Sequence, residues 1–193
     1  MVVAPAEAVH LRAWHASAGS TVEHKGRHCI IAQLLEDTAF AYRFAGGVLT
    51  HCGLRTFDQH PWHAPLAGTV LETWIISVQA CLKVQMIQSH ASQGSLYAVE
   101  GAGYQFIQTR GLVILDTSVG LVACLPVGMA QVFSVVITAE VGKAIRKGEG
   151  MGYFQFGGSD FAMLFGTGCK VQFTCAGDSH RLQGVASGIC AAD

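Results

Sequence analysis

The feature that most constrains the fold is a long stretch without any charged side chain, residues 117–139. It is long enough to cross a bilayer as a helix. It also contains Gly120, Pro126 and Gly128 among many β-branched residues, which interrupt a helix and favour strands. We therefore predict short buried strands here and no transmembrane segment.

Short apolar runs punctuated by glycine recur along the rest of the chain. They cover residues 68–71, 111–115, 120–124, 132–137, 151–156 and 161–165. One short helix is predicted from Cys29 to about Asp37, where apolar residues recur at helical spacing. Hydrophobic residues make up 51% of the 193 residues and charged residues 13%, which excludes disorder and fits one domain. We expect an α+β, β-rich single domain with short helices.

Charge and cysteine usage limit the partners and the compartment. Twelve Lys and Arg against thirteen Asp and Glu, without a basic block, argue against a nucleic-acid partner. The seven cysteines are an odd number without CxxC spacing, and the N-terminus lacks the features of a signal peptide. These observations predict free thiols and a cytoplasmic location. The histidines outside residues 60–63 show no metal-ligand spacing, so no metal is predicted. The small, polar segment 177–193 is predicted to be a flexible tail.

Four motifs follow one another along the chain. Residues 2–8 read VVAPAEA, residues 25–30 read KGRHCI, residues 60–70 read HPWHAPLAGTV, and residues 147–161 read KGEGMGYFQFGGSDF. Gly-Gly-Ser between two apolar strands is by itself typical of a tight turn. The order and approximate spacing of all four motifs add a second interpretation.

Together these motifs resemble the phosphatidylserine decarboxylase family, over roughly residues 2–173. The resemblance implies a phosphatidylserine-decarboxylase-like barrel, with a catalytic domain at residues 1–176. It also implies self-cleavage between Gly158 and Ser159, which turns Ser159 into a pyruvoyl cofactor and leaves chains 1–158 and 159–193 associated. The family's upstream region has no counterpart here, so the sequence is interpreted as a fragment or a short divergent member.

The chemistry of self-cleavage assigns roles to individual residues. The Ser159 hydroxyl would attack the Gly158 carbonyl after a nearby base removes its proton. His63 is the candidate base, because imidazole titrates near neutral pH. The resemblance places Glu7 behind that histidine, as the carboxylate of a Ser-His-acid triad. It makes His60 a candidate for positioning the substrate carboxylate or delivering a proton, although a surface histidine before a proline turn explains His60 equally well.

Two departures from the family pattern bear on competence. Asp160 stands where relatives usually carry Thr or Ser, and its charge could raise the cost of the oxyanion formed beside it. Glu7 stands where relatives carry Asp and is one methylene longer, which could loosen the triad.

The sequence leaves several functions open. The first is conversion of phosphatidylserine to phosphatidylethanolamine, with peripheral membrane contact left open. The second is decarboxylation of a soluble aromatic amino acid such as tryptophan, which the lack of a basic amphipathic helix mildly favours. The third is an uncleaved, inactive relative. A biotinyl or lipoyl carrier is disfavoured, because Lys83 lies within an apolar run instead of at a hairpin tip.

Overall fold

The structure is a computed structural model that describes residues 1–15, 21–24, 27–36, 39–77, 84–87, 95–98, 109–128, 135–155, 159–174 and 177–192. Two expectations fall outside these ranges, the Lys25-Gly26 turn and the environment of Lys83. Gly158 also lies outside them, and Ser159 is described by its backbone alone.

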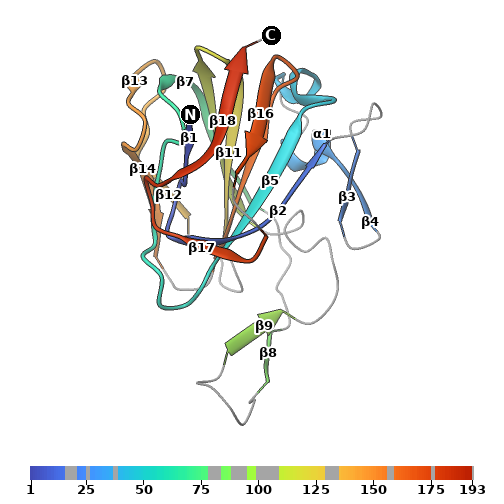
Figure 1. Ribbon diagram of the computed structural model, residues 1–193, viewed down its shortest axis with the longest axis vertical. Coiled ribbons are helices and arrows are strands. Elements are labelled where there is room, and N and C mark those ends of the chain that lie inside the picture. Colours follow the sequence, from blue (N-terminus) through green and yellow to red (C-terminus); the bar gives the residue numbers. More distant parts are fainter. Residues whose placement is uncertain are drawn as a thin grey trace.

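Strands dominate the described chain, and eight of them form one antiparallel sheet (Figure 1). In spatial order these are β13 (Ala144–Ile145), β7 (Gly68–Ile76), β10 (Arg110–Thr117), β11 (Gly120–Gly128), β15 (Ser159–Phe165), β5 (Val48–Leu54), β2 (Ala8–His15) and β17 (Ser179–Arg181). β15 is paired along its whole length, to β11 on one side and β5 on the other.

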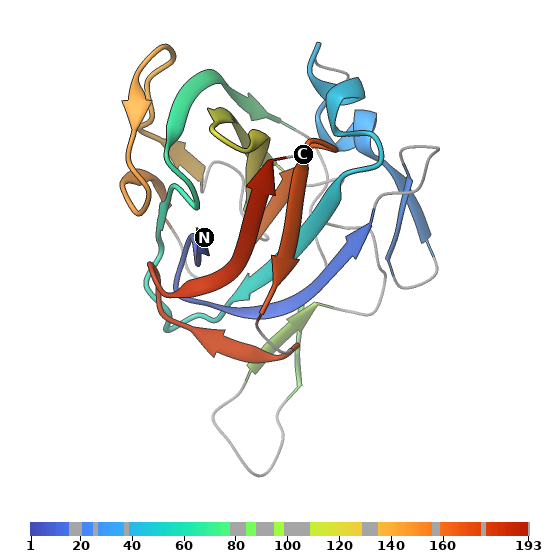
Figure 2. The same cartoon turned by 45° about the horizontal axis from the view of Figure 1, so that its top comes forward.

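Two three-stranded sheets complete the main body. One has the order β1 (Val2–Val3), β18 (Ala186–Ala192), β16 (Cys169–Phe173), and the other β12 (Val135–Ile137), β14 (Gly150–Phe154), β6 (Pro61–His63). The hairpins β3 (Thr21–His24)–β4 (Arg27–Ile30) and β8 (Val84–Ile87)–β9 (Ser95–Ala98) lie apart from them. Figure 2 shows the strands curving around the N-terminus. The described helices are α1 (Ile31–Leu34) and a 3₁₀ turn (Ala41–Phe44).

The two faces of the large sheet carry two separate hydrophobic clusters. Along β15, Phe161 and Met163 belong to the first cluster, whereas Ala162 and Leu164 belong to the second. This alternation is the ordinary consequence of successive strand residues pointing to opposite faces. The first cluster also contains Trp62, so it links the large sheet to β6.

The expectation of a β-rich fold with little helix is confirmed, and the glycine-punctuated runs 111–115, 120–124 and 161–165 lie in strands. The helix is shorter than expected and spans four residues. Strand β2 was not expected, and the segment predicted as a flexible tail contains β17 and β18. In the described sheet β13 and β17 each pair on one side, so closure into a barrel remains a prediction. No helix in the described ranges has the length and apolar character needed to cross a membrane.

Candidate active site

The segment with the two histidines is held against the strand that precedes the Gly-Gly-Ser motif. β6 pairs antiparallel with β14, with His63 opposite Gly150 and Trp62 opposite Gly152. A Cβ atom at Gly152 would collide with the Trp62 indole and with the Val136 carbonyl. Glycine is therefore required at position 152 to let the two strands approach.

The indole of Trp62 also connects this segment to β15. Its ring lies 5.8 Å from the ring of Phe161, measured between centroids, and both side chains are fully buried. Phe161 is two residues after Ser159, so the histidine segment lies alongside the beginning of β15. The structure thus brings together two motifs that are about a hundred residues apart in the sequence.

The N-terminal motif, residues 2–8, meets the histidine segment mainly through backbone groups. We call the place where this motif, the histidine segment and the start of β15 meet the corner of the site. The His63 N–H donates a hydrogen bond of 2.7 Å to the Pro5 carbonyl, and the Gln59 N–H donates one of 3.1 Å to Glu7 Oε2. His63 Nδ1 is buried and has no hydrogen-bond partner among the described residues. Burying an imidazole nitrogen without a hydrogen-bond partner destabilises the folded state. A group that binds this nitrogen at another stage of function would offset that cost.

The Glu7 carboxylate contacts a histidine other than the expected one. His180, on β17, lies with Nε2 3.8 Å from Glu7 Oε1 and 3.1 Å from Asp58 Oδ1. Arg55 in turn binds the Asp58 carboxylate through its side chain, at 2.8 Å, and through its backbone N–H. Burial alone would raise the pKa of Asp58, but the hydrogen bonds from Arg55 and His180 lower it overall.

Glu7, Asp58 and His180 offer ligand atoms within 4.8 Å of one another, an arrangement that resembles a metal site. The Arg55 guanidinium already balances the charge of Asp58, which accounts for the cluster without an ion. No role is predicted for His180 from the sequence, because it shows no metal-ligand spacing. Its contact with Asp58, 122 residues away, arises from the fold.

His60 lies at the edge of this corner and is partly exposed. Its ring is edge-on to Phe154 at 6.4 Å between centroids, and its carbonyl accepts a hydrogen bond of 3.0 Å from the Phe154 N–H. The His60 side chain therefore reaches solvent, whereas the Nδ1 atom of His63 is buried.

Asp160 is buried rather than exposed beside the cleavage position. It is 5% exposed, and its Oδ2 atom lies 3.1 Å from Nε2 of His51, which is 6% exposed. His51 stacks on Trp14 with ring centroids 6.4 Å apart, on the side of the second hydrophobic cluster. The carboxylate at position 160 therefore has the imidazole of His51 as its neighbour.

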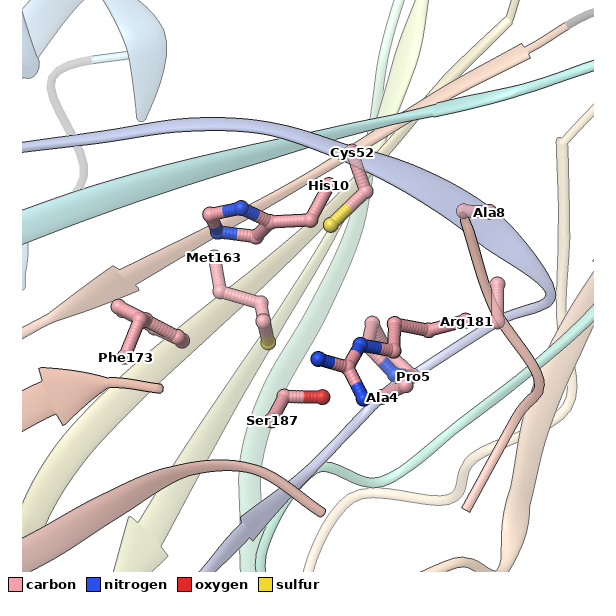
Figure 3. A pocket seen from close by; sticks show the side chains of 10 residues that line it. Ala4, Pro5, Ala8, His10, Cys52, Met163, Phe173, Arg181 and Ser187 are labelled. Carbon is pink, nitrogen blue, oxygen red and sulfur yellow. The ribbon is translucent and has the colours of Figure 1, made fainter. Parts of the chain in front are cut away.

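A small pocket lies beside the Pro5–Glu7 segment, among residues of the first cluster (Figure 3). Figure 3 shows the Arg181 guanidinium and the Ser187 hydroxyl extending into it, with His10 and Met163 on the opposite side. Burial lowers the pKa of His10, and the nearby Arg181 and His51 lower it further. The pocket has room for about one water molecule, so it is too small for the expected substrates.

Comparison with known proteins assigns the chain to a family. The family profile described as phosphatidylserine decarboxylase matches residues 1–184, nearly the whole chain. The chain therefore belongs to the phosphatidylserine decarboxylase family, whose members are decarboxylases and thus carboxy-lyases.

Individual relatives include decarboxylases named for different substrates. The chain is 28% identical to the decarboxylase iboD of Amanita muscaria, over 72% of this chain and 43% of the relative. It is 25% identical to an L-tryptophan decarboxylase of Psilocybe cubensis, over 88% and 41%. It is 30% identical to phosphatidylserine decarboxylase proenzyme 3 of Schizosaccharomyces pombe, over 73% and 14%. The chain thus spans less than half the length of each of these relatives.

Proposed function

We propose that this chain is the catalytic core of a pyruvoyl-dependent decarboxylase that cleaves itself between Gly158 and Ser159. The observation that carries the proposal is the meeting of three distant motifs at one corner. The His63 N–H binds the Pro5 carbonyl, and Trp62 packs on Phe161, two residues after Ser159. This arrangement supports Ser159 as nucleophile, with His63 and Glu7 as the other members of a triad.

The residues present fit a group formed at position 159. Phe161 and Met163 lie two and four residues after position 159, so their side chains point to the same face of β15 as position 159. Both belong to the cluster that contains Trp62. Alternation along β15 therefore assigns position 159 to the face that carries the histidine segment. The buried, unpartnered His63 Nδ1 provides a second sign of fit, because a carboxylate reaching it would complete the triad.

Cleavage proceeds in steps that this chain's residues can perform. His63 removes the hydroxyl proton and Ser159 Oγ attacks the Gly158 carbonyl carbon. The Gly158–Ser159 C–N bond then breaks to give an ester, and His63 returns the proton to the Ser159 amine that leaves. A base then removes the Ser159 α-proton, and Gly158 leaves as a carboxylate. Addition of water to the residue left at 159 releases ammonia and leaves a carbonyl. This carbonyl supplies the electron sink that decarboxylation of an amine substrate needs.

The corner also supplies groups for the substrate. His60 is accessible and lies three residues from His63, so it is assigned to position the substrate carboxylate or to deliver a proton. Glu7 remains the residue that orients His63. For this role its carboxylate has to turn from His180 toward His63, and the long side chain of glutamate permits that rotation.

The substrate proposed first is phosphatidylserine, in keeping with the family. The alternative is L-tryptophan or a similar aromatic amino acid, which the match to the Psilocybe cubensis enzyme over 88% of this chain favours. We also assign the protein to a reducing, cytoplasmic compartment, with peripheral membrane contact if phosphatidylserine is the substrate. The buried free thiols of Cys52, Cys124, Cys169 and Cys190 support that compartment.

Separate activity assays with each compound distinguish the two proposed substrates. Purified protein is incubated with phosphatidylserine vesicles or with L-tryptophan, and the released carbon dioxide and amine product are measured. Ser159→Ala is the control, because it removes only the hydroxyl group and cannot form the carbonyl. Formation of phosphatidylethanolamine supports the first proposal and tryptamine the second. A fully cleaved protein that releases carbon dioxide from neither would contradict both.

A further inference from the structure

We infer that His51 is a positioning residue for self-cleavage, which offsets the charge of Asp160 so that Ser159 can react beside a carboxylate. The inference rests on the proposed function and deepens it. His51 and Asp160 lie outside the triad, on the opposite face of the large sheet from the one assigned to Ser159. Two observations and one chemical argument carry the inference.

The first observation is the close contact itself. Asp160 Oδ2 and His51 Nε2 are 3.1 Å apart, and the two side chains are 7% and 8% exposed. A carboxylate at such a depth requires a polar or positive neighbour, because burial penalises its charged form. His51 lies opposite Ala162 in the β5–β15 register, so it reaches Asp160 diagonally across the two strands.

The second observation is the face on which the pair lies. Ala162 and Leu164 share the parity of Asp160 and belong to the second cluster, which also packs against Trp14. Trp14 stacks on His51. The pair therefore holds the Asp160 carboxylate on the face opposite the one assigned to Ser159.

The chemical argument concerns the steps that the proposed self-cleavage requires next to Asp160. Attack on Gly158 develops an oxyanion, and removal of the Ser159 α-proton develops negative charge that spreads into the Ser159 carbonyl. That carbonyl is bonded directly to the Asp160 nitrogen. A carboxylate without its imidazole neighbour would oppose both steps by like-charge repulsion in a site of low dielectric constant.

The inference predicts opposite outcomes for two substitutions that break the same contact. His51→Gln leaves the carboxylate without the imidazole and should slow self-cleavage about tenfold or more. Asp160→Asn removes the charge and should cleave at least as fast as the wild-type chain. The double variant His51→Gln/Asp160→Asn should recover the wild-type rate within about twofold, because no charge remains to be offset.

The rates are measured by cell-free synthesis of the full chain, with samples quenched over time and the cleaved fraction read from intact mass. The matched control is His10→Gln, which alters a buried histidine of similar exposure on the other face of the sheet. It should leave the rate unchanged. Unfolding midpoints are measured for the same substitutions in a Ser159→Ala chain, where all molecules stay intact.

A purely structural role would give a different pattern. His51→Gln and Asp160→Asn would then slow cleavage to a similar extent and lower the unfolding midpoint in parallel, and that result would overturn the inference. Equal rates for wild type and His51→Gln would also overturn it, while leaving the proposed function intact. A wild-type chain that is never cleaved would overturn the proposed function, and the inference with it.

Discussion

The backbone N–H of His63 donates a hydrogen bond of 2.7 Å to the carbonyl of Pro5. This bond ties the histidine motif to the N-terminal motif two residues before Glu7. Pro5 is well suited to this position, because it fixes its own φ and offers only a carbonyl for hydrogen bonding. The site therefore depends on a main-chain contact, which side-chain substitutions at position 63 should leave in place.

His60, just before β6, and His63, within it, should separate self-cleavage from decarboxylation. His63→Gln removes the base, so we expect cleavage to fall by a factor of about 100 or more. His60→Gln should still be cleaved, because His60 is assigned to the substrate, but its decarboxylation rate should fall by at least about tenfold. Intact mass measures the first effect and product formation the second. Normal cleavage of the His63→Gln chain would remove His63 from the triad.

The two products of cleavage should stay together. The chain 159–193 contains β15, which lies between β11 and β5, and also β16, β17 and β18, of which β17 pairs with β2 and β18 with β1. Because β15 contributes side chains to both hydrophobic clusters, its release would expose both. We expect the fragments to elute as one species in native size-exclusion chromatography and to separate in strong denaturant. Separate elution under native conditions would contradict this account.

Asp58 should contribute to stability at neutral pH and lose that contribution in acid. Its folded-state pKa is lowered from 3.8, so its stabilising effect is fully present above that pH and lost as the pH falls below it. In a Ser159→Ala chain, Asp58→Asn should lower the free energy of unfolding at pH 7 by about 2 kcal/mol. The penalty should shrink at pH 3. Urea denaturation at both pH values measures it.

Glu140→Gln is the matched control for Asp58→Asn. Glu140 and its partner Lys143 are 74% and 71% exposed and 3.9 Å apart. Exposed ion pairs contribute little to stability, so this substitution should change the free energy of unfolding by less than about 0.5 kcal/mol. If the two substitutions lowered the free energy of unfolding equally, burial of Asp58 would not account for its contribution to stability.

Local pattern predicted the central strands well. In β10 and β11, apolar β-branched residues are bounded by Gly111 and Gly120, and strand structure is the natural result. β2 was missed because polar residues such as His10 and His15 made its segment look like a loop, although neighbouring strands bury His10. β17 and β18 were missed for a related reason. β17 is short and polar, and β18 is rich in small residues with little strand preference, so pairing with β2, β1 and β16 supplies the order.

The motifs located the corner of the site, and the fold supplied the partners that no motif contains. His63 and Glu7 follow from the resemblance, and the structure places their segments in contact. His180 and His51 could not be found in this way, because each meets its carboxylate only through strand pairing far along the chain. The fold also places His51 next to Asp160, a contact that the sequence could not show.

The most direct test of the central claim is the intact mass of the purified wild-type chain, measured beside Ser159→Ala. The account predicts two wild-type fragments separated after Gly158, with the smaller one blocked at its N-terminus by a carbonyl that reacts with a hydrazine probe. The Ser159→Ala chain should give one full-length mass and no reaction. A single full-length mass for both chains would contradict self-cleavage and leave an uncleaved member of the family.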